Sequence, residues 1–170
     1  MKKYSALIII IITSLFACTN NSNGFEKNQD KIYESASLEA STPIDTRDTI
    51  TVIASGANMS EMQFDTKLIK VPAQKQITIK LVNESTDATM PHNFVVIKNG
   101  TANDVGQAGY KHLDNAYVSP QDENVFGHTP LAQINETVYL TFTTPNAGEH
   151  QFICSYPGHW GMMKGSFITE

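Results

Sequence analysis

Apolar and polar residues alternate in several short segments of the chain, and this pattern predicts β-strands. In residues 76–82, for example, Ile77, Ile79 and Leu81 fall on one face and mostly polar residues fall on the other. The predicted strands cover residues 49–54, 64–71, 76–82, 93–98, 137–143, 149–154 and 166–169. Clusters of Gly, Pro and Asn separate them, so the pattern indicates an all-β protein built as a Greek-key β-sandwich or barrel.

Residues 101–127 do not follow this pattern. Alternation is weak there, and polar residues and alanines interrupt the few large apolar ones. A long segment without strands is usually functional or contains a helix of its own. We therefore expect an inserted flap with a short helix around residues 104–113.

The start of the chain has the composition of an export signal. Lys2 and Lys3 precede an apolar run at residues 6–12, which is too short to span a bilayer comfortably. The run leads to the sequence LFAC at residues 15–18, which resembles the lipobox of bacterial lipoproteins, where cleavage leaves the cysteine as a lipid-modified N-terminus. An ordinary signal peptide, with Cys18 as a free or pairing thiol, is the alternative.

These features divide the chain into three parts. Residues 1–17 are predicted to be a lipoprotein-type signal peptide. Residues 18–47, rich in Asn, Ser, Thr, Lys and Glu, are predicted to be the lipidated cysteine and a flexible tether, and residues 48–170 the folded domain. The mature protein is then expected outside the cytoplasm, in the periplasm or at the cell surface, with a lipid anchor at Cys18 holding it to a membrane.

Charge and cysteine content narrow the range of functions. The 170 residues carry a net charge of −5, and loss of residues 1–17 removes two lysines and brings it to −7. An acidic balance of this size argues against nucleic-acid binding. If Cys18 carries lipid, Cys154 is the remaining cysteine of the chain and a disulfide is impossible. A lone thiol in an oxidising compartment is a liability unless something occupies it, and a metal would do so.

Residues that bind metals gather near the end of the chain. Residues 154–165 read CSYPGHWGMMKG, and the spacing Cys-x4-His-x3-Met joins Cys154, His159 and Met163. A second histidine, His92, stands far upstream at the start of an apolar run. One cysteine, two histidines and one methionine are the ligand set of a trigonal copper site with a weak axial thioether. Zinc is the alternative metal, because affinity alone discriminates poorly between the two ions.

With these residues laid out, residues 48–170 resemble a cupredoxin, and within that superfamily they resemble azurin most. The resemblance rests on the sequence MPHN at residues 90–93 and on the ligand loop at residues 154–165. Smaller similarities lie at residues 58–66 and 127–129. The resemblance implies the cupredoxin fold, with the flap in the place of azurin's helical insertion.

The sequence departs from the azurin pattern at three points. The usual azurin disulfide has no counterpart. Pro91 stands where azurin has glycine. The resemblance implies that the carbonyl at this position is a distant axial contact of the metal. Trp160 stands where a small residue is usual, which is expected to change the surface that partners meet.

The resemblance also implies a role for each ligand. His92, Cys154 and His159 would be the equatorial ligands of one type 1 copper ion, and Met163 would be the axial ligand. Met162 is one residue too early for this role and is expected to project elsewhere. A thiolate with two imidazoles suits both Cu(I) and Cu(II), so the site need not rearrange much when an electron moves.

Two further residues are expected to act on the ligands. The side chain of Asn93 would bridge the loops that bear His92 and Cys154. The amides of Asn93 and Tyr156 would donate hydrogen bonds toward the sulfur, whereas Pro157 has no N–H to give.

We expect an apolar patch for redox partners around the exposed edge of His159, next to Pro91. The patch consists of Met90, Pro157, Trp160 and Met162. Such a patch permits close approach without tight binding. His112 and His128 are expected at the surface without a ligand role, and Met59 and Met62 in the core or in the patch.

The sequence thus predicts a blue copper protein that carries single electrons between a donor and an acceptor redox protein in transient encounters. It is not expected to be an enzyme, because it shows no nucleophile–base pattern and no second metal centre. It is also expected to be monomeric. A copper-binding module that stores, delivers or senses the ion is the alternative. A catalytic copper protein with an open coordination position is a weaker one, because Met163 would close that position.

Overall fold

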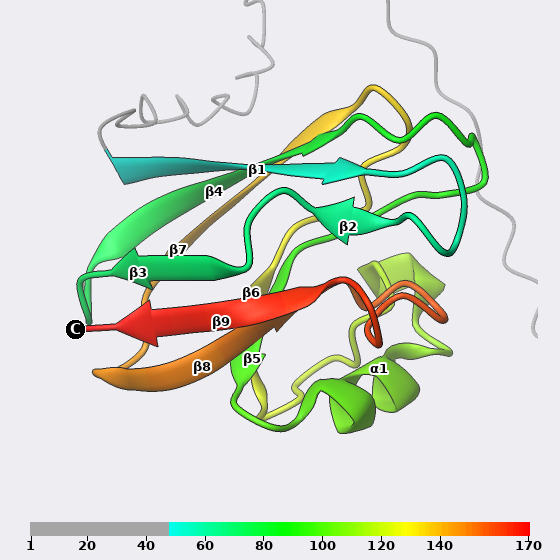
Figure 1. The fold of residues 1–170 in the computed structure, drawn as a ribbon. Helices are drawn as coiled ribbons and strands as arrows, with labels where there is room; N and C mark the ends of the chain where they lie inside the picture. Colours follow the sequence, from blue (N-terminus) through cyan, green and yellow to red (C-terminus); the bar gives the residue numbers. More distant parts are fainter. Residues whose placement is uncertain (1–47) are drawn as a thin grey trace, which may run out of the picture. The chain divides into compact units, whose positions relative to one another are not determined.

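The computed structural model describes residues 48–170, and two β-sheets packed against each other form this domain (Figure 1). The first sheet has the order β2 (Gln63–Phe64), β1 (Thr49–Ser55), β4 (Gln76–Asn83) and β7 (Thr137–Thr143). The second has the order β3 (Leu68–Val71), β9 (Lys164–Thr169), β8 (Gly148–Ile153), β5 (Val95–Lys98) and β6 (Val125–His128). The pairs β1–β4 and β3–β9 are parallel. The prediction of an all-β sandwich with a helical insertion is confirmed.

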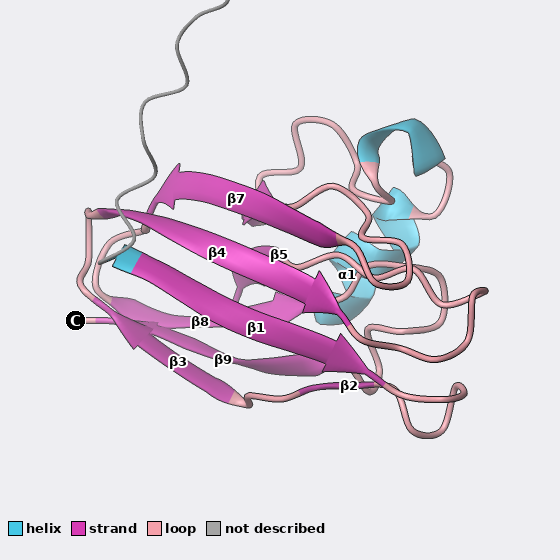
Figure 2. Cartoon of the chain, turned by 90° about the horizontal axis from the view of Figure 1, so that it is seen from above, coloured by secondary structure: helices cyan, strands magenta, loops and turns pink. Residues whose placement is uncertain are grey.

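One predicted strand, at residues 64–71, is wrong, because two strands of different sheets occupy this segment. β2 pairs with β1 in the first sheet, and β3 pairs with β9 in the second. The chain leaves β2 at Asp65, whose carboxylate accepts a hydrogen bond from the N–H of Ile53 in β1 at 2.9 Å. The segment therefore crosses from one layer of the sandwich to the other (Figure 2).

The insertion contains the expected helix and one strand that the sequence pattern does not reveal. The helix α1 (Ala102–Gly109) begins two residues before the predicted range, and a 3-10 turn (Leu113–Asn115) follows it. β6 then returns the chain to the second sheet beside β5. All four residues of β6 are half-buried, so its sequence lacks the apolar alternation of a strand with one dry and one wet face.

Two apolar cores flank β5, which explains the continuous apolar run of this strand. The main core lies between the sheets, where the rings of Phe64, Phe94 and Phe152 meet at centroid distances of 4.8–5.7 Å. The second core lies under the insertion and contains Val95, Ile97, Val105, Val118 and Ile153. A strand with both faces buried reads as an apolar run rather than as an alternation.

The predicted signal peptide, the lipidated Cys18 and the tether lie outside the described residues. Within residues 48–170, no helix has the length and apolar character that crossing a bilayer requires. The assignments of residues 1–17 and 18–47 therefore remain predictions.

Candidate metal centre

Three side chains that are far apart in the sequence converge at one end of the sandwich. The Nδ1 atoms of His92 and His159 lie 3.8 Å and 3.6 Å from the sulfur of Cys154, and 3.2 Å from each other. All three residues are buried. Within residues 48–170 they form the cluster whose ligand atoms are close enough together to hold one metal ion.

The spacing of these atoms fits a metal ion between them. Bonds of about 2.0 Å to nitrogen and about 2.3 Å to sulfur, at angles of about 120°, separate the donors by about 3.5 Å and about 3.7 Å. The observed separations of 3.2–3.8 Å agree with these values. A thiolate and two imidazoles are soft to intermediate donors, which suit copper and zinc and do not suit magnesium or calcium.

The backbone around His92 is fixed by pairing with another loop. The N–H of His92 donates to the carbonyl of Ala132 at 3.1 Å, and the N–H of Ala132 donates back at 2.7 Å. Directly after, the N–H of Phe94 donates to the hydroxyl of Thr129, and the N–H of Thr129 donates to the carbonyl of Phe94. Backbone hydrogen bonds thus anchor both His92 and Phe94 shortly before β5 begins at Val95.

Asn93 joins the two segments that bear the ligands, as the sequence predicts. Its side-chain oxygen accepts a hydrogen bond from the N–H of Ser155 at 2.8 Å, and its amide nitrogen donates to the Ser155 hydroxyl at 2.8 Å. The same nitrogen donates to the carbonyl of Ala116 in the insertion at 2.7 Å. Three parts of the chain therefore meet at one buried amide.

The loop at residues 154–165 closes on itself between β8 and β9. The N–H of Cys154 donates to the carbonyl of Met163, and the N–H of Met163 donates to the carbonyl of His159, each at 2.9 Å. Gly158 has a φ of +87°, a conformation that residues with a Cβ rarely adopt. This glycine lets the chain turn sharply between Cys154 and His159, so that both side chains reach the same point.

Burial controls the protonation of these groups. It raises the pKa of the Cys154 thiol to about 12, against the opposing effect of hydrogen bonds that the backbone N–H groups of Asn93 and Tyr156 donate to the sulfur. Burial also lowers the pKa of His92 and His159 to about 4. Near neutral pH the imidazoles are therefore neutral, as metal ligation requires, and a metal that binds here displaces the thiol proton.

Comparison with known proteins agrees with this geometry. Residues 50–170 match the family of copper binding proteins described as the plastocyanin/azurin family. The chain belongs to this family. Auracyanin-A of Chloroflexus aurantiacus is 36% identical over 118 residues, which are 68% of this chain and 72% of that protein. Azurin of Alcaligenes faecalis is 40% identical over 112 residues, which are 62% and 88%.

Other comparisons extend this likeness. Outer membrane protein H.8 of Neisseria meningitidis is 38% identical over 109 residues, 61% of this chain and 60% of that protein. The solved structure of auracyanin A, a blue copper protein, matches with a TM-score of 0.61 and 31% identity over 72% of this chain and 99% of that one. Azurin iso-2 of Methylomonas sp. strain J matches with a TM-score of 0.63 and 30% identity, over 72% and 97%. The domain is an azurin-like cupredoxin with one copper ion.

The two neighbouring methionines of the cupredoxin loop differ sharply in exposure. Met163 is 0% exposed and packs in the main core with Cys154, whereas Met162 is 49% exposed. This difference favours Met163 as the axial ligand over Met162. The axial roles of Met163 and of the Pro91 carbonyl remain predictions.

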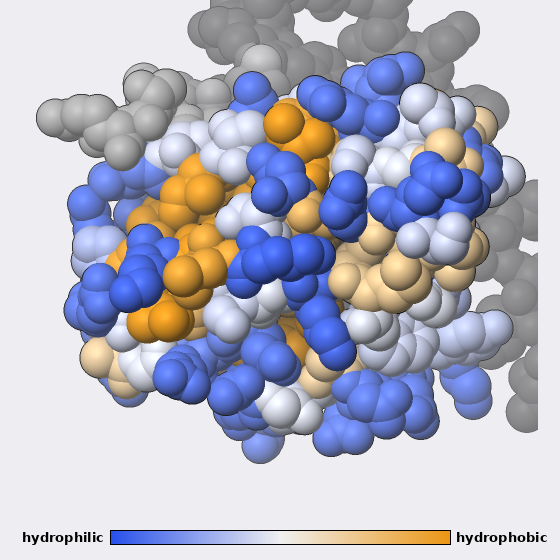
Figure 3. All heavy atoms as spheres, in the orientation of Figure 1, coloured by the Kyte–Doolittle hydropathy of each residue, from blue (hydrophilic) through white to orange (hydrophobic). Residues whose placement is uncertain are grey.

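The predicted apolar patch needs one correction. Met90 is 3% exposed, because it packs into the main core, so it offers almost no surface to a partner. Met59 takes its place, since it is 50% exposed and its terminal methyl lies against Gly158, 3.3 Å from where a Cβ would stand. Weakly hydrophobic side chains gather at the end of the molecule that carries the loops, shown in pale orange in Figure 3.

Trp160 has a packing role that the sequence does not show. It is half-buried and lies on the core under the insertion. A Cβ at Gly106 of α1 would stand 2.4 Å from the Cδ2 atom of the indole, so the ring rests directly on the helix backbone. Trp160 therefore packs the ligand loop onto the insertion, and only part of its surface is available to a partner.

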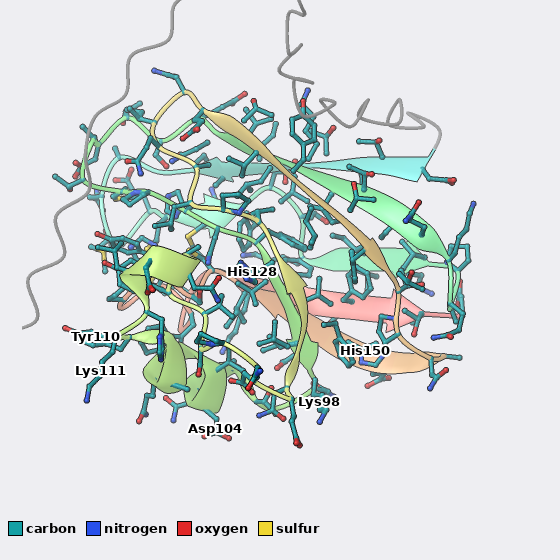
Figure 4. The ribbon with its side chains drawn as sticks, turned by 180° about the vertical axis from the view of Figure 1, so that it is seen from behind. Lys98, Asp104, Tyr110, Lys111, His128 and His150 are labelled. Atoms are coloured by element: carbon teal, nitrogen blue, oxygen red, sulfur yellow. The ribbon has the colours of Figure 1, made fainter. Side chains whose placement is uncertain are left out.

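The remaining histidines of the described domain lie outside the metal cluster. His128 and His150 stand on β6 and β8 (Figure 4), and His112 lies in the insertion. Asp104, Tyr110 and Lys111 project outward from the insertion in the same view. Sequence reasoning missed Asn83, Ser85 and Ser155, whose contacts support the ligands. Small polar residues next to strands give no signal that distinguishes them from turn residues.

Proposed function

We propose that this chain is a blue copper protein that carries single electrons between redox partners outside the cytoplasm. His92, Cys154 and His159 would hold the copper, and Met163 would be its weaker fourth ligand. Membership of a blue copper family implies electron transfer. The observation that carries the proposal is that the donors already stand at metal-bonding separations, in a buried and densely hydrogen-bonded site.

A preformed site suits a carrier because electron transfer slows when ligands must move. The copper ion, when bound, supplies a one-electron couple between Cu(I) and Cu(II). The protein holds its donors through Asn93, through the backbone pairing of His92 with Ala132, and through the closed loop after Cys154. These contacts are made by the protein alone, so we expect them to keep one geometry in both oxidation states.

His159 offers the route by which an electron would enter or leave. Within residues 48–170, each fully buried side-chain nitrogen and oxygen has a hydrogen-bond partner. Nε2 of His159 has no such partner, so it is not fully buried and retains contact with solvent. Met59, Pro157 and Met162 are half-buried or exposed near this loop. We call these three residues the docking patch. Flexible thioethers adapt to different partner surfaces, which suits brief encounters.

The proposed location outside the cytoplasm rests on the signal-like start of the chain and on one relative. The LFAC sequence at residues 15–18 resembles a lipobox, and a 38% identical relative is named outer membrane protein H.8. A lipid on Cys18 would keep the carrier close to membrane-bound donors and acceptors. Mass spectrometry of the exported protein tests this, since a lipid-modified Cys18 at the N-terminus is expected and an unmodified thiol would refute the anchor.

Loading the protein with Cu(II) tests the carrier function. We expect an intense blue absorption band, a narrow copper hyperfine splitting in the paramagnetic resonance spectrum, and reversible one-electron reduction. A colourless site that loses copper rapidly to a chelator would instead indicate storage or delivery. Met163→Leu should keep the colour and raise the potential, while the matched Met162→Leu should leave both unchanged. An unmoved potential in Met163→Leu would show that the axial assignment is wrong.

Electron self-exchange between Cu(I) and Cu(II) copies tests the docking patch without a known partner. Met162→Glu should slow self-exchange by about tenfold or more at low salt, because two like charges would meet at the contact. Tyr139→Glu, at an exposed position on β7, is the matched control and should change the rate much less. Equal rates in the two variants would argue against the patch.

A further inference from the structure

The ring of His92 has a partner on each of its two nitrogens. Nδ1 faces the sulfur of Cys154, and Nε2 lies 3.0 Å from the hydroxyl oxygen of Ser85. Ser85 is 2% exposed, so the hydroxyl is enclosed with the imidazole rather than shared with solvent. His159 lacks such a partner on its Nε2 among the residues that the structure describes. The two histidines therefore differ on the side that faces away from the metal.

Ser85 is itself fixed by Asn83, the last residue of β4. The N–H of Ser85 donates to the side-chain oxygen of Asn83 at 3.0 Å. The amide nitrogen of Asn83 donates to the carbonyls of Met90 at 3.1 Å and of Ala132 at 3.0 Å. Met90 is two residues before His92, and Ala132 pairs with the His92 backbone. One buried amide thus holds both the hydroxyl and the backbone that carries the imidazole.

This arrangement selects one form of the imidazole. A neutral histidine that binds a metal through Nδ1 carries its proton on Nε2. A buried N–H of this kind requires an acceptor, and the Ser85 oxygen stands at hydrogen-bond distance from it. A hydrogen bond at this position orients the ring and makes the other nitrogen a stronger donor to the metal.

We propose that Ser85 is a positioning residue for the copper site, which accepts the Nε2–H hydrogen bond of His92 and holds Nδ1 toward the metal. The proposal rests on His92 as a copper ligand, which is part of the function proposed above. The strengthened imidazole stabilises Cu(II) more than Cu(I), because the doubly charged ion gains more from a better nitrogen donor. Ser85 therefore lowers the reduction potential, and Asn83 acts through it.

Ser85→Ala tests the effect on the metal, with Ser85→Thr as the conservative variant that keeps the hydroxyl. In Ser85→Ala we expect Cu(II) affinity to fall about 10-fold to 100-fold, with a smaller loss of Cu(I) affinity. A tenfold difference between the two losses raises the potential by about 59 mV. Ser85→Thr should restore at least part of the loss, and Ser166→Ala, at an exposed position on β9, should change neither quantity.

A lower thermal stability of Ser85→Ala with unchanged copper affinities and an unchanged potential would overturn the proposal, since a merely structural role predicts that result. Should Ser85→Ala not fold, the native protein decides the question. In its Zn(II)-loaded form, nuclear magnetic resonance should show the Nε2 proton of His92 with slow solvent exchange and a coupling to Nε2. A proton on Nδ1, or rapid exchange, would refute the proposal. The zinc measurement involves no electron transfer, so its outcome is independent of the carrier function.

Discussion

The two histidines of the metal centre are held by different kinds of interaction. Buried hydrogen bonds hold His92: its backbone pairs with Ala132 and its ring contacts Ser85. Turn geometry and packing hold His159: its N–H donates to the carbonyl of Tyr156, and its neighbour Trp160 rests on the insertion. Changes near His92 should therefore alter the metal's properties, whereas changes near Trp160 should alter the stability of the loop.

This difference matches the place of each histidine in the domain. His92 lies deep between two loops of the sandwich, where an unpaired polar group is costly and hydrogen bonds are correspondingly strong. His159 is also buried, but it lies in the loop that carries the exposed Met162, where we propose that a partner approaches. The two rings therefore differ in their outer nitrogens: Nε2 of His92 contacts Ser85, whereas Nε2 of His159 has no hydrogen-bond partner among the described residues and retains contact with solvent.

The largest effect is expected at Cys154, whose sulfur lies next to both histidines. Cys154→Ser should abolish the blue band completely, because the absorption requires the copper–thiolate bond. The visible spectrum after addition of Cu(II) checks this. Cys18→Ser is the matched control and should keep the full colour. A blue Cys154→Ser protein would show that this sulfur is not a ligand.

Asn93 joins the segment that bears His92 to the segment that bears Cys154, so its removal should destabilise both. Asn93→Ala leaves the N–H of Ser155 without its buried partner, and it removes one of the two hydrogen bonds that the carbonyl of Ala116 accepts. The unsatisfied N–H costs about 1–3 kcal/mol and the lost hydrogen bond about 0.5–1.5 kcal/mol, so we expect a loss of about 2–4 kcal/mol in the free energy of unfolding. Urea denaturation measures it. Asn99→Ala, at an exposed position after β5, should cost far less, and equal losses would contradict the bridging role.

The two imidazoles should also make the metal-free protein sensitive to acid. Burial lowers the pKa of His92 and His159 to about 4, against 6.5 for an exposed histidine. Between these values the unfolded chain binds more protons than the folded one, so stability falls as the pH decreases from about 6.5 to about 4. Thermal unfolding of the metal-free protein across this range measures the loss.

The control for this prediction is a protein without the two titrating groups. In His92→Leu/His159→Leu, the fall in melting temperature between pH 6.5 and pH 4 should be smaller than in the native chain. An equal fall in both proteins would assign the acid sensitivity to other groups.

The contact between Trp160 and the insertion predicts that Gly106→Ala destabilises the native protein but stabilises a protein without Trp160. Gly106→Ala places a methyl group against the indole ring and should cost about 1–3 kcal/mol in the free energy of unfolding. In a Trp160→Ala background the clash is absent, and the same substitution should stabilise the helix by about 0.5–1 kcal/mol.

Gly161→Ala is the matched control, since a Cβ at Gly161 meets no atom within 4 Å. It should change the stability little in either background. Urea denaturation of the four Gly106 and Trp160 combinations completes the cycle. If Gly106→Ala has the same effect with and without Trp160, the ring does not connect the two segments.

Much of the sandwich could be predicted from the sequence, because alternating strands such as β4 and β7 face the core on one side and polar surroundings on the other. The ligand spacing, together with the resemblance to azurin, also predicted that His92, Cys154 and His159 come together. Local patterns specify the strands and the spacing within residues 154–165, whereas the link to the distant His92 came from the resemblance.

The features that the sequence did not reveal depend on contacts between distant segments. The chain crosses between sheets at Asp65 because this carboxylate meets the backbone of β1. Met90 is buried by the core rather than exposed beside His159. The contact of Ser85 with His92 depends on how a loop folds over the end of β4, and no periodicity encodes that.

Trp160 has one practical consequence. It is the one tryptophan among the 170 residues, and it directly follows His159. The tryptophan fluorescence therefore comes from one residue, the sequence neighbour of a proposed metal ligand, and bound Cu(II) should quench it by energy transfer. The intensity then reports metal occupancy, and the emission maximum reports whether the loop still rests on the insertion. The intrinsic fluorescence of Trp160 can therefore be used to measure the rates of metal uptake and loss without a label.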